Sequence, residues 1–301
     1  MHRTKQFYIL QIIIMNKIIL YLLFPAMLWQ GSEIYAQKRN TDLGIAVMSF
    51  NIRNSNAKDD LNSWENRRNW VGDLIHFYQP DLIGLQEVLH LQLGDLLERL
   101  PEYGYIGVAR NDGKTEGEYS PIFYNKKRFE LIKSATFWLA EDTEKPNKSW
   151  GATYRIVTWG QLKDKNTGDY FFLFNTHFDN REKAREESAR LLLEKVGQIA
   201  GSQPAIITGD FNSNSQSIPY QILTERKGKK GFWDTRLLAK SWYGPLWTFH
   251  SFGKVPVESR EQIDYIFSNR KVTVEQYVSI SEQRGEVFPS DHLPILVRIQ
   301  F

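Results

Sequence analysis

The side chains of this 301-residue sequence that could carry out chemistry gather in six short polar fragments. These fragments supply carboxylates, amides and two imidazoles, and the chain contains no cysteine. Oxygen donors of this kind prefer Mg²⁺, Mn²⁺ or Ca²⁺ to zinc. Without a thiol, the chain can build no disulfide, cysteine nucleophile or iron–sulfur cluster. The fragments are residues 49–53, 84–88, 175–179, 209–212, 263–266 and 290–294.

Each fragment adjoins an apolar, strand-like run, where a rigid scaffold can present a side chain. Taken alone, an Asp or Asn in that position is more often a turn former, and a single His is more often an ordinary core or surface residue. Six fragments that share one donor chemistry favour a common site over six unrelated turns.

The sequence around these fragments predicts a single domain over residues 37–301, because no Pro- or Ser-rich linker, repeat or low-complexity tract interrupts it. A composition with 42% apolar and 24% charged residues excludes a multi-span membrane protein and a disordered chain. Long runs of strands broken by a few helices favour two sheets packed face to face with helices outside. The predicted helices are 63–78, 89–100, 181–201 and 217–224, and the predicted strands are 45–51, 81–85, 103–108, 121–124, 129–139, 156–163, 170–176, 205–208, 262–267, 272–280 and 293–300.

The first 36 residues have the pattern of a secretory signal peptide. Read from Met15, which is a possible true start, Lys17 precedes the apolar run Ile18–Trp29. A polar stretch then leads to Ala36, a small residue suited to cleavage. We therefore expect export to a bacterial periplasm or to the exterior.

An uncleaved membrane anchor over Phe7–Trp29 is the alternative to this leader, although Asn16 and Lys17 near its middle make it costly. After removal of the leader, 35 basic and 34 acidic residues remain, so the exported chain is nearly neutral. That charge is too small to indicate nucleic-acid binding by electrostatics alone.

The six fragments, taken in order, resemble the endonuclease/exonuclease/phosphatase family, which includes DNase I, abasic-site endonucleases, inositol polyphosphate phosphatases, bacterial sphingomyelinases and deadenylases. The resemblance implies an α+β fold, a four-layer α/β/β/α sandwich of two packed mixed or antiparallel sheets. It also implies divalent-metal dependence and hydrolysis of a phosphate ester. The matching fragments read Ser-Phe-Asn-Ile-Arg, Gly-Leu-Gln-Glu-Val, Asn-Thr-His-Phe-Asp, Gly-Asp-Phe-Asn, Ile-Asp-Tyr-Ile and Ser-Asp-His-Leu-Pro.

Carried over residue by residue, the resemblance implies a divalent-metal site. Glu87 matches the family's central metal ligand, a carboxylate that binds Mg²⁺ directly while waters complete the octahedron. Asn51 matches the neighbouring amide, which orients the site without adding charge, and Asp291 resembles a second carboxylate on the metal side. The expected cofactor is Mg²⁺, with Mn²⁺ or Ca²⁺ as alternatives.

The resemblance also implies a set of catalytic residues. Asp210 matches the residue that positions or deprotonates the attacking water, and Asn212 would donate to a phosphoryl oxygen. His292 matches the essential imidazole, paired with an acid that fixes its tautomer, for which Asp264 is the candidate. Whether Asp210 or His292 is the base stays open. His177 matches a second histidine that contacts the scissile phosphate and is a candidate proton donor to the leaving oxygen.

Four further residues are candidates for substrate binding. In DNase-like members a glutamate partners the second histidine, and Glu118 lies in that slot, with an ordinary loop acid as the alternative. Arg155 could clamp a phosphate with two hydrogen bonds or bridge carboxylates. Arg185 follows His177 closely on a helix face rich in ion pairs. Trp247 could stack on a base or sugar, or cap the core.

The function predicted from these residues is that of an exported, metal-dependent hydrolase of phosphate esters, either a phosphodiesterase or a phosphomonoesterase. Its substrate would be a small organic phosphate, a sugar phosphate, a lipid headgroup or a nucleic acid. A DNase I-like nuclease is one alternative, and a binding module that lost the chemistry is a weaker one, because every matched side chain is present. We expect a monomer without an obligate protein partner.

Overall fold

The computed structural model describes residues 44–226 and 231–301. The predicted leader over residues 1–36 lies outside the described residues, so cleavage and export stay predictions. Within the described ranges, no helix is both long and apolar enough to cross a membrane. Residues Ile45–Phe301 form one compact unit.

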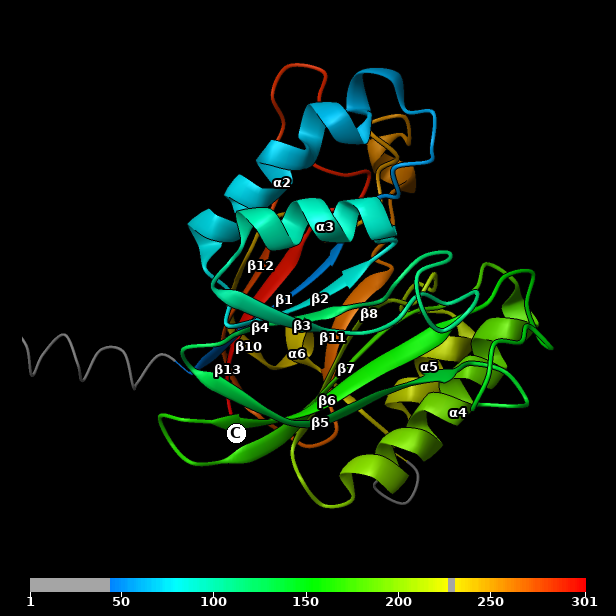
Figure 1. Ribbon diagram of the computed structural model, residues 1–301, viewed down its shortest axis with the longest axis vertical. Helices are drawn as coiled ribbons and strands as arrows, with labels where there is room; N and C mark the ends of the chain where they lie inside the picture. Colours follow the sequence, from blue (N-terminus) through cyan, green and yellow to red (C-terminus); the bar gives the residue numbers. More distant parts are fainter. Residues whose placement is uncertain (1–43, 227–230) are drawn as a thin grey trace, which may run out of the picture. The chain divides into compact units, whose positions relative to one another are not determined.

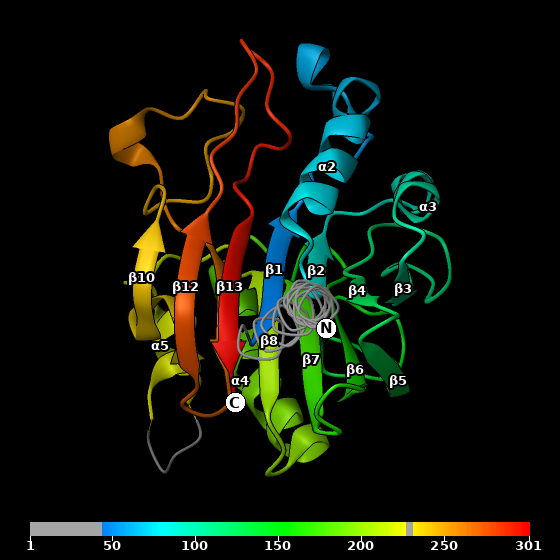
Figure 2. The ribbon, with the colours of Figure 1, turned by 90° about the vertical axis from the view of Figure 1, so that its left-hand side faces the viewer.

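Two β-sheets form the centre of this unit (Figure 1). The first has the strand order β10-β12-β13-β1-β2-β4-β3, and Figure 2 shows these strands side by side. Its strands are β1 (Ile45–Asn51), β2 (Leu82–Gln86), β3 (Tyr103–Ile106), β4 (Ile122–Asn125), β10 (Ala239–Tyr243), β12 (Thr273–Ser279) and β13 (Ile295–Gln300). The second sheet has the order β5-β6-β7-β8-β11-β9. Its strands are β5 (Phe129–Trp138), β6 (Ile156–Asp164), β7 (Tyr170–His177), β8 (Ala205–Asp210), β9 (Trp233–Asp234) and β11 (Asp264–Ser268).

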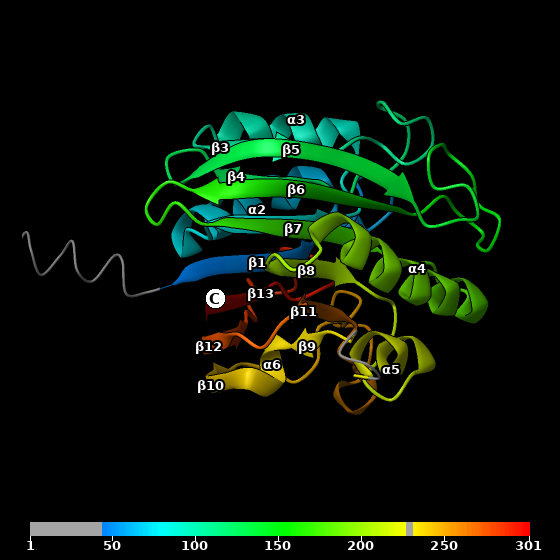
Figure 3. The same cartoon turned by 90° about the horizontal axis from the view of Figure 1, so that it is seen from below.

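Helices cover the outer face of each sheet, α2 and α3 on one side and α4 and α5 on the other (Figure 3). The resulting four-layer α/β/β/α sandwich confirms the predicted fold class. A short helix α6 and two 3₁₀ turns complete the described elements. The helices are α2 (Trp64–Tyr78), α3 (His90–Arg99), α4 (Glu182–Ala200), α5 (Ile218–Thr224) and α6 (Thr235–Leu238), and the 3₁₀ turns are η1 (Asp60–Asn62) and η3 (Val257–Ser259).

The alternation of side chains along a strand explains why the sheets pack in this order. In β1, Met48 and Phe50 join the apolar cluster under α2 and α3, whereas Val47 joins the cluster between the two sheets. In β7, Phe174 packs toward α4, and Leu173 faces the first sheet. Both faces of each central strand are therefore buried, as expected for sheets covered by helices.

All four predicted helices and all eleven predicted strands are present, and their ends move by no more than two residues. The prediction missed β9, α6, β10 and the two 3₁₀ turns. Strand β9 has two residues and α6 has four, which is too short for a periodic pattern. Strand β10 is mostly exposed at the edge of its sheet, so it lacks the apolar alternation of a half-buried strand.

A buried polar contact joins the two sheets close to their shared edge. The Asn175 side chain of β7 donates from Nδ2 to the carbonyls of Leu85 (2.6 Å) and Pro121 (2.9 Å). Its Oδ1 accepts from Gln86 Nε2 (2.7 Å) and Thr208 Oγ1 (3.0 Å). The amide thus uses its full hydrogen-bonding capacity. The approach is possible because a Cβ on residue 84, a glycine, would lie 2.5 Å from Asn175 Oδ1.

We expect Asn175→Ala to destabilise the protein by about 2–4 kcal/mol, because it leaves buried carbonyls and donors without partners. Urea unfolding measures this loss. Tyr170→Phe, at the exposed start of the same strand, is the control and should stay within about 0.5 kcal/mol of the parent. Equal stability of the two variants would contradict a structural role for the contact.

Candidate active site

The predicted site residues meet at one edge of the sandwich because of the strand directions. Strands β1 and β2 are parallel, with Asn51 opposite Gln86 at their ends. Strands β7 and β8 are also parallel, with His177 opposite Asp210. Strand β11 runs antiparallel to β8 and begins beside Asp210. Five segments far apart in sequence therefore present their terminal side chains to one place.

The His292 imidazole lies between two carboxylates in the interior of this edge. Its Nδ1 is 2.9 Å from Asp264 Oδ2, and its Nε2 is 3.7 Å from Asp210 Oδ2. Burial disfavours a charged imidazole, but the charges of Asp264 and Asp210 outweigh this effect and raise the pKa of His292. Burial, together with the charge of Asp264, raises the pKa of Asp210. The expected pairing of His292 with Asp264 is thus present.

The Asn51 amide connects this imidazole to the predicted metal ligands. Its Nδ2 donates to Asp210 Oδ2 (2.9 Å) and Glu87 Oε1 (3.1 Å), and lies 3.5 Å from His292 Nε2. The side chain is fully buried. The neutral Asn51 amide therefore lies between the carboxylates of Asp210 and Glu87 and adds no charge of its own.

Glu87 stands directly after β2 in a left-handed backbone conformation, with φ of 60°. Arg53 and Asn212, in two other loops of the site, share this conformation. Side chains other than glycine rarely adopt it, and it costs about 1–3 kcal/mol per residue. The surrounding contacts must therefore hold these residues in place.

The electrostatics around Glu87 fit a cation. Burial opposes its charge, but His292 and the hydrogen bonds from Asn54 and Asn51 hold the pKa of Glu87 below its usual value. Burial raises the pKa of the nearby Asp291, and the charge on Glu87 adds to the rise. Two buried carboxylates that repel each other, beside an amide, are a hard-oxygen donor set of the kind Mg²⁺ selects. Asn51, Glu87 and Asp291 thus fit a divalent ion.

Within the described ranges, the ligand atoms of Asp210, Asp264 and His292 lie within 4.8 Å of one another, close enough to hold a metal ion. His292 Nδ1 already contacts Asp264, and the two carboxylates raise the pKa of His292. The trio is therefore a second candidate metal site, and it is also suited to holding and moving protons.

His177 and Asn212 form the opposite wall of the site. Asn212 Nδ2 donates to the carbonyl of Phe178 (2.9 Å) and lies 3.1 Å from His177 Nε2. The same Nε2 is 3.6 Å from Asp210 Oδ2, and Nδ1 faces Glu118 Oε2 at 3.9 Å. Burial and the nearby Arg155 and Arg110 charges lower the pKa of His177 well below its usual value, which favours the neutral imidazole. Proton donation by His177 to a leaving oxygen stays a prediction.

Two buried arginines lie beside this histidine. Arg155 Nε is 3.9 Å from Asp179 Oδ2, and Arg155 Nε and Nη1 have no hydrogen-bond partner among the described residues. The guanidinium thus pairs with a carboxylate and also keeps donors that a phosphate could occupy, so both interpretations of Arg155 stay open. Glu118 lies next to His177, as expected, but its closest partner is Arg110, whose Nη1 is 2.5 Å away. Glu118 therefore forms an ion pair with Arg110 as well as lying beside His177, and a substrate contact stays a prediction.

The other two predicted substrate residues contact the site indirectly. Arg185 Nη1 donates to the backbone carbonyl of Asn212 (2.5 Å), so its guanidinium supports the loop, and a substrate contact stays a prediction. Trp247 is half-buried between the Arg260 guanidinium, 4.4 Å from the ring centre, and the His250 ring. A substrate contact of Trp247 stays a prediction.

The sequence analysis missed buried residues that support the loops of the site. Arg67 of α2 is fully buried and donates to the carbonyls of Ile52, Arg53 (2.8 Å) and Pro289 (3.1 Å), which fixes the loops after β1 and before Asp291. An arginine on an amphipathic helix usually marks a solvated face, so no sequence signal distinguishes it.

Two other missed residues lie near fragments that the sequence did single out. Asn54 donates from its backbone and side chain to Glu87 Oε2 (3.1 and 2.8 Å). It follows the first fragment by one residue. Arg110 is eight residues before Glu118, and only the fold brings the two together.

Comparison with known proteins agrees with this geometry. The model of the endonuclease/exonuclease/phosphatase family matches residues 48–292. A crystal structure of an endonuclease/exonuclease/phosphatase from Bacteroides vulgatus is 41% identical, with a TM-score of 0.82, over 85% of this chain and 98% of that one. A mannosyl-6-phosphatase from Bacteroides thetaiotaomicron is 34% identical, with a TM-score of 0.80, over 85% of this chain and 100% of that one.

Among curated proteins, human nocturnin is 27% identical over 263 residues, which cover 79% of this chain and 58% of nocturnin. The chain spans less than two thirds of the length of the curated relatives it matches. The fold and the site together define a hydrolase of phosphate esters. The chain belongs to the endonuclease/exonuclease/phosphatase family, whose enzymes depend on divalent metal ions.

Replacing Asp264 by Asn removes the negative charge that raises the pKa of His292, but the Asn side chain keeps the shape of the original carboxylate. We expect kcat to fall by about 10²–10⁴, with the fold unchanged by circular dichroism. Asp73→Asn, on the exposed side of α2, is the control and should keep full activity. Near-normal turnover of the Asp264 variant would refute the role of this pair.

Glu87→Gln tests the metal site without relying on activity. Loss of one carboxylate should raise the dissociation constant for Mg²⁺ or Mn²⁺ by roughly tenfold or more in a calorimetric titration. Glu130→Gln, on an exposed part of β5, should leave binding unchanged. An unaltered affinity in the Glu87 variant would place the ion elsewhere.

Proposed function

We propose that this chain is a metal-dependent phosphomonoesterase that releases phosphate from a small sugar phosphate. The proposal rests on one observation, the buried Asn51 amide. Its Nδ2 donates to Asp210 and Glu87 and lies beside His292, so it links these three residues. It brings a proton acceptor, a positive charge and a cation site together at one edge of the sandwich. Water attack on phosphorus needs all three of these.

In this proposal, Asp210 accepts the proton of the attacking water. Its raised pKa makes it a better base than an ordinary carboxylate, and Asn212 N and Asn51 Nδ2 orient its two oxygens. His292 carries its proton at neutral pH, so it is unsuited to be the base and acts as a positive hydrogen-bond donor to the phosphoryl group. The proposal thus assigns the base to Asp210, one of the two residues between which the sequence left the choice open.

The opposite wall binds the phosphate itself. Arg155 Nη1, which has no hydrogen-bond partner among the described residues, would donate to its oxygens. One N–H of the Asn212 amide is held by the Phe178 carbonyl, and the other would donate to a phosphoryl oxygen as charge develops in the transition state. Preorganised donors of this kind typically contribute about 3–4 kcal/mol each.

Asn51, Glu87 and Asp291 would hold the divalent ion, for which Mg²⁺ is the expected species. When bound, the ion supplies positive charge that neutralises the phosphate and lowers the barrier to attack. Arg53, 3.8 Å from Asp291 Oδ2, adds a fixed positive charge beside these ligands.

Two observations support a sugar phosphate as the substrate class. The solved structure that is 34% identical and covered over its whole length is named a mannosyl-6-phosphatase. The predicted exported chain is nearly neutral, whereas a duplex nuclease neutralises several phosphates with Lys and Arg. A small monoester therefore suits this chain better than DNA.

Phosphate release from hexose 6-phosphates, measured with Mg²⁺ or Mn²⁺, tests the proposal. We expect turnover that EDTA abolishes. Asp210→Ala or His292→Ala should reduce this turnover by several orders of magnitude and leave the melting temperature unchanged. Cleavage of plasmid DNA or RNA in preference to sugar phosphates would instead favour a nuclease. Turnover of no phosphate ester at all would leave only a binding module.

A further inference from the structure

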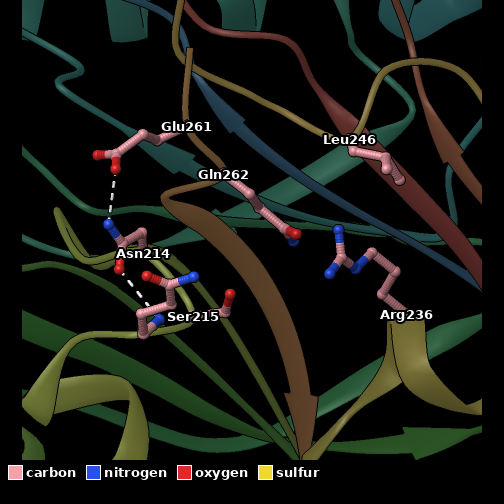
Figure 4. Close-up of a pocket in the computed structure, with 7 residues that line it drawn as sticks. Asn214, Ser215, Arg236, Leu246, Glu261 and Gln262 are labelled. Carbon is pink, nitrogen blue, oxygen red and sulfur yellow. Dashed lines mark hydrogen bonds between the residues drawn. The ribbon is translucent and has the colours of Figure 1, made fainter. Parts of the chain in front are cut away.

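A pocket of about 320 Å³ lies close in the chain to the catalytic residues. Figure 4 shows the side chains around it, which come from the loop after β8, from α6, from the loop after β10 and from the segment before β11. The cavity lies at the lower end of the size range of ligand pockets, so it suits one small ring rather than a chain. The polar side chains that line it are Asn214, Ser215, Gln216, Arg236, Glu261 and Gln262.

The Gln262 side chain offers this pocket a hydrogen-bond acceptor. Gln262 is only 8% exposed, and its Oε1 has no hydrogen-bond partner among the described residues. Its Nε2 is fixed by the Asp264 carbonyl (3.2 Å) and the Tyr277 hydroxyl (3.2 Å), so the amide cannot turn away. Figure 4 shows this amide extending toward Arg236. A buried acceptor without a partner costs about 1–3 kcal/mol, which a ligand hydroxyl would recover.

Hydrogen bonds fix the segments that form the walls of the pocket. Asn214 Nδ2 donates to Glu261 Oε1 at 2.6 Å, which joins the loop after β8 to the segment before β11. Asn214 Oδ1 accepts from the backbone of Gln216 at 3.0 Å. The polar groups are therefore positioned before any ligand arrives, which lowers the entropic cost of binding.

The charge pattern identifies the chemistry of the ligand. Arg236 and Glu261 carry opposite charges, and the remaining polar groups are neutral amides and a hydroxyl, so donors and acceptors are mixed without a net charge. A second phosphate would meet the Glu261 carboxylate. A nucleobase would need a stacking ring, and no aromatic side chain is among the described residues that line the pocket. Neutral hydroxyl groups, which both donate and accept, match this lining.

The position of the pocket relates it to the reacting phosphate. Gln262 lies two residues before Asp264, and Asn214 lies two residues after Asn212. Two residues span at most about 7 Å of chain. The backbone of these two pocket residues thus lies within about 7 Å of the backbone of Asp264 and Asn212, a separation that one small molecule can span.

We propose that this pocket binds the hydroxyl-bearing ring of the substrate, with Arg236, Glu261 and Gln262 contacting its hydroxyls. The inference rests on the proposed phosphomonoesterase function and adds to it the residues that select a sugar. Leu246, at 58% exposure, supplies an apolar side chain at the rim for the carbon face of such a ring.

Arg236→Gln and Glu261→Gln remove one charge each from partly or fully exposed positions, so folding should be preserved. We expect each to raise KM for a hexose 6-phosphate at least fivefold, and to change kcat/KM for p-nitrophenyl phosphate, whose ring has no hydroxyls, less than twofold. Arg190→Gln, on exposed α4, is the matched control and should change neither. Calorimetric titration of the EDTA-treated protein with the same hexose phosphate should show the same loss of affinity.

The outcomes separate the pocket from the function it serves. If the parent enzyme hydrolyses hexose phosphates and both pocket variants keep its KM, the pocket assignment is wrong and the proposed function stands. Equal losses on both substrates would show that these residues only support the Asn212 loop, which also overturns the assignment. If the parent releases no phosphate from any hexose phosphate, the proposed function itself fails.

Discussion

The arrangement of the site depends on one close approach between the two sheets, where the Asn175 side chain of β7 contacts the backbone of β2. Residue 84 must lack a side chain for this approach to occur, since a Cβ there would overlap the Asn175 amide. Glu87 follows three residues after this glycine, and His177 follows two residues after Asn175. A single, fully satisfied amide therefore sets the register between the strand that carries the main carboxylate and the strand that carries the neutral imidazole.

Burial makes the charges of the site depend on one another. Asp210, Asp264, Glu87 and Asp291 are all nearly inaccessible to water, so their mutual repulsion is weakly screened. The protein offsets this repulsion with a charged imidazole, with Arg53 and with the neutral amide of Asn51. Replacing one of these partners changes the protonation of the others, and the cation site and the proton acceptor are consequently parts of a single electrostatic unit.

The sequence predicted the elements and the reacting residues because both have local signals. The spacing of apolar residues locates the helices and strands. The motifs that contain Glu87 and His292 are short and contiguous. Contacts that the tertiary fold creates have no such signal. Arg110 pairs with Glu118 across a loop, Arg67 lies on the buried face of α2, and Arg185 contacts a backbone carbonyl. The polar pocket was missed for the same reason, since its walls come from four separate segments.

Three residues of the site, Arg53, Glu87 and Asn212, keep left-handed backbone conformations that their side chains disfavour. Glycine at any of them would relax the backbone and remove the side chain that the site uses. Selection for heat resistance alone would therefore favour changes that sacrifice catalysis at these positions. An engineer who wants a more robust enzyme should leave these loops alone and seek gains in the outer helical layers, where tolerance is greatest.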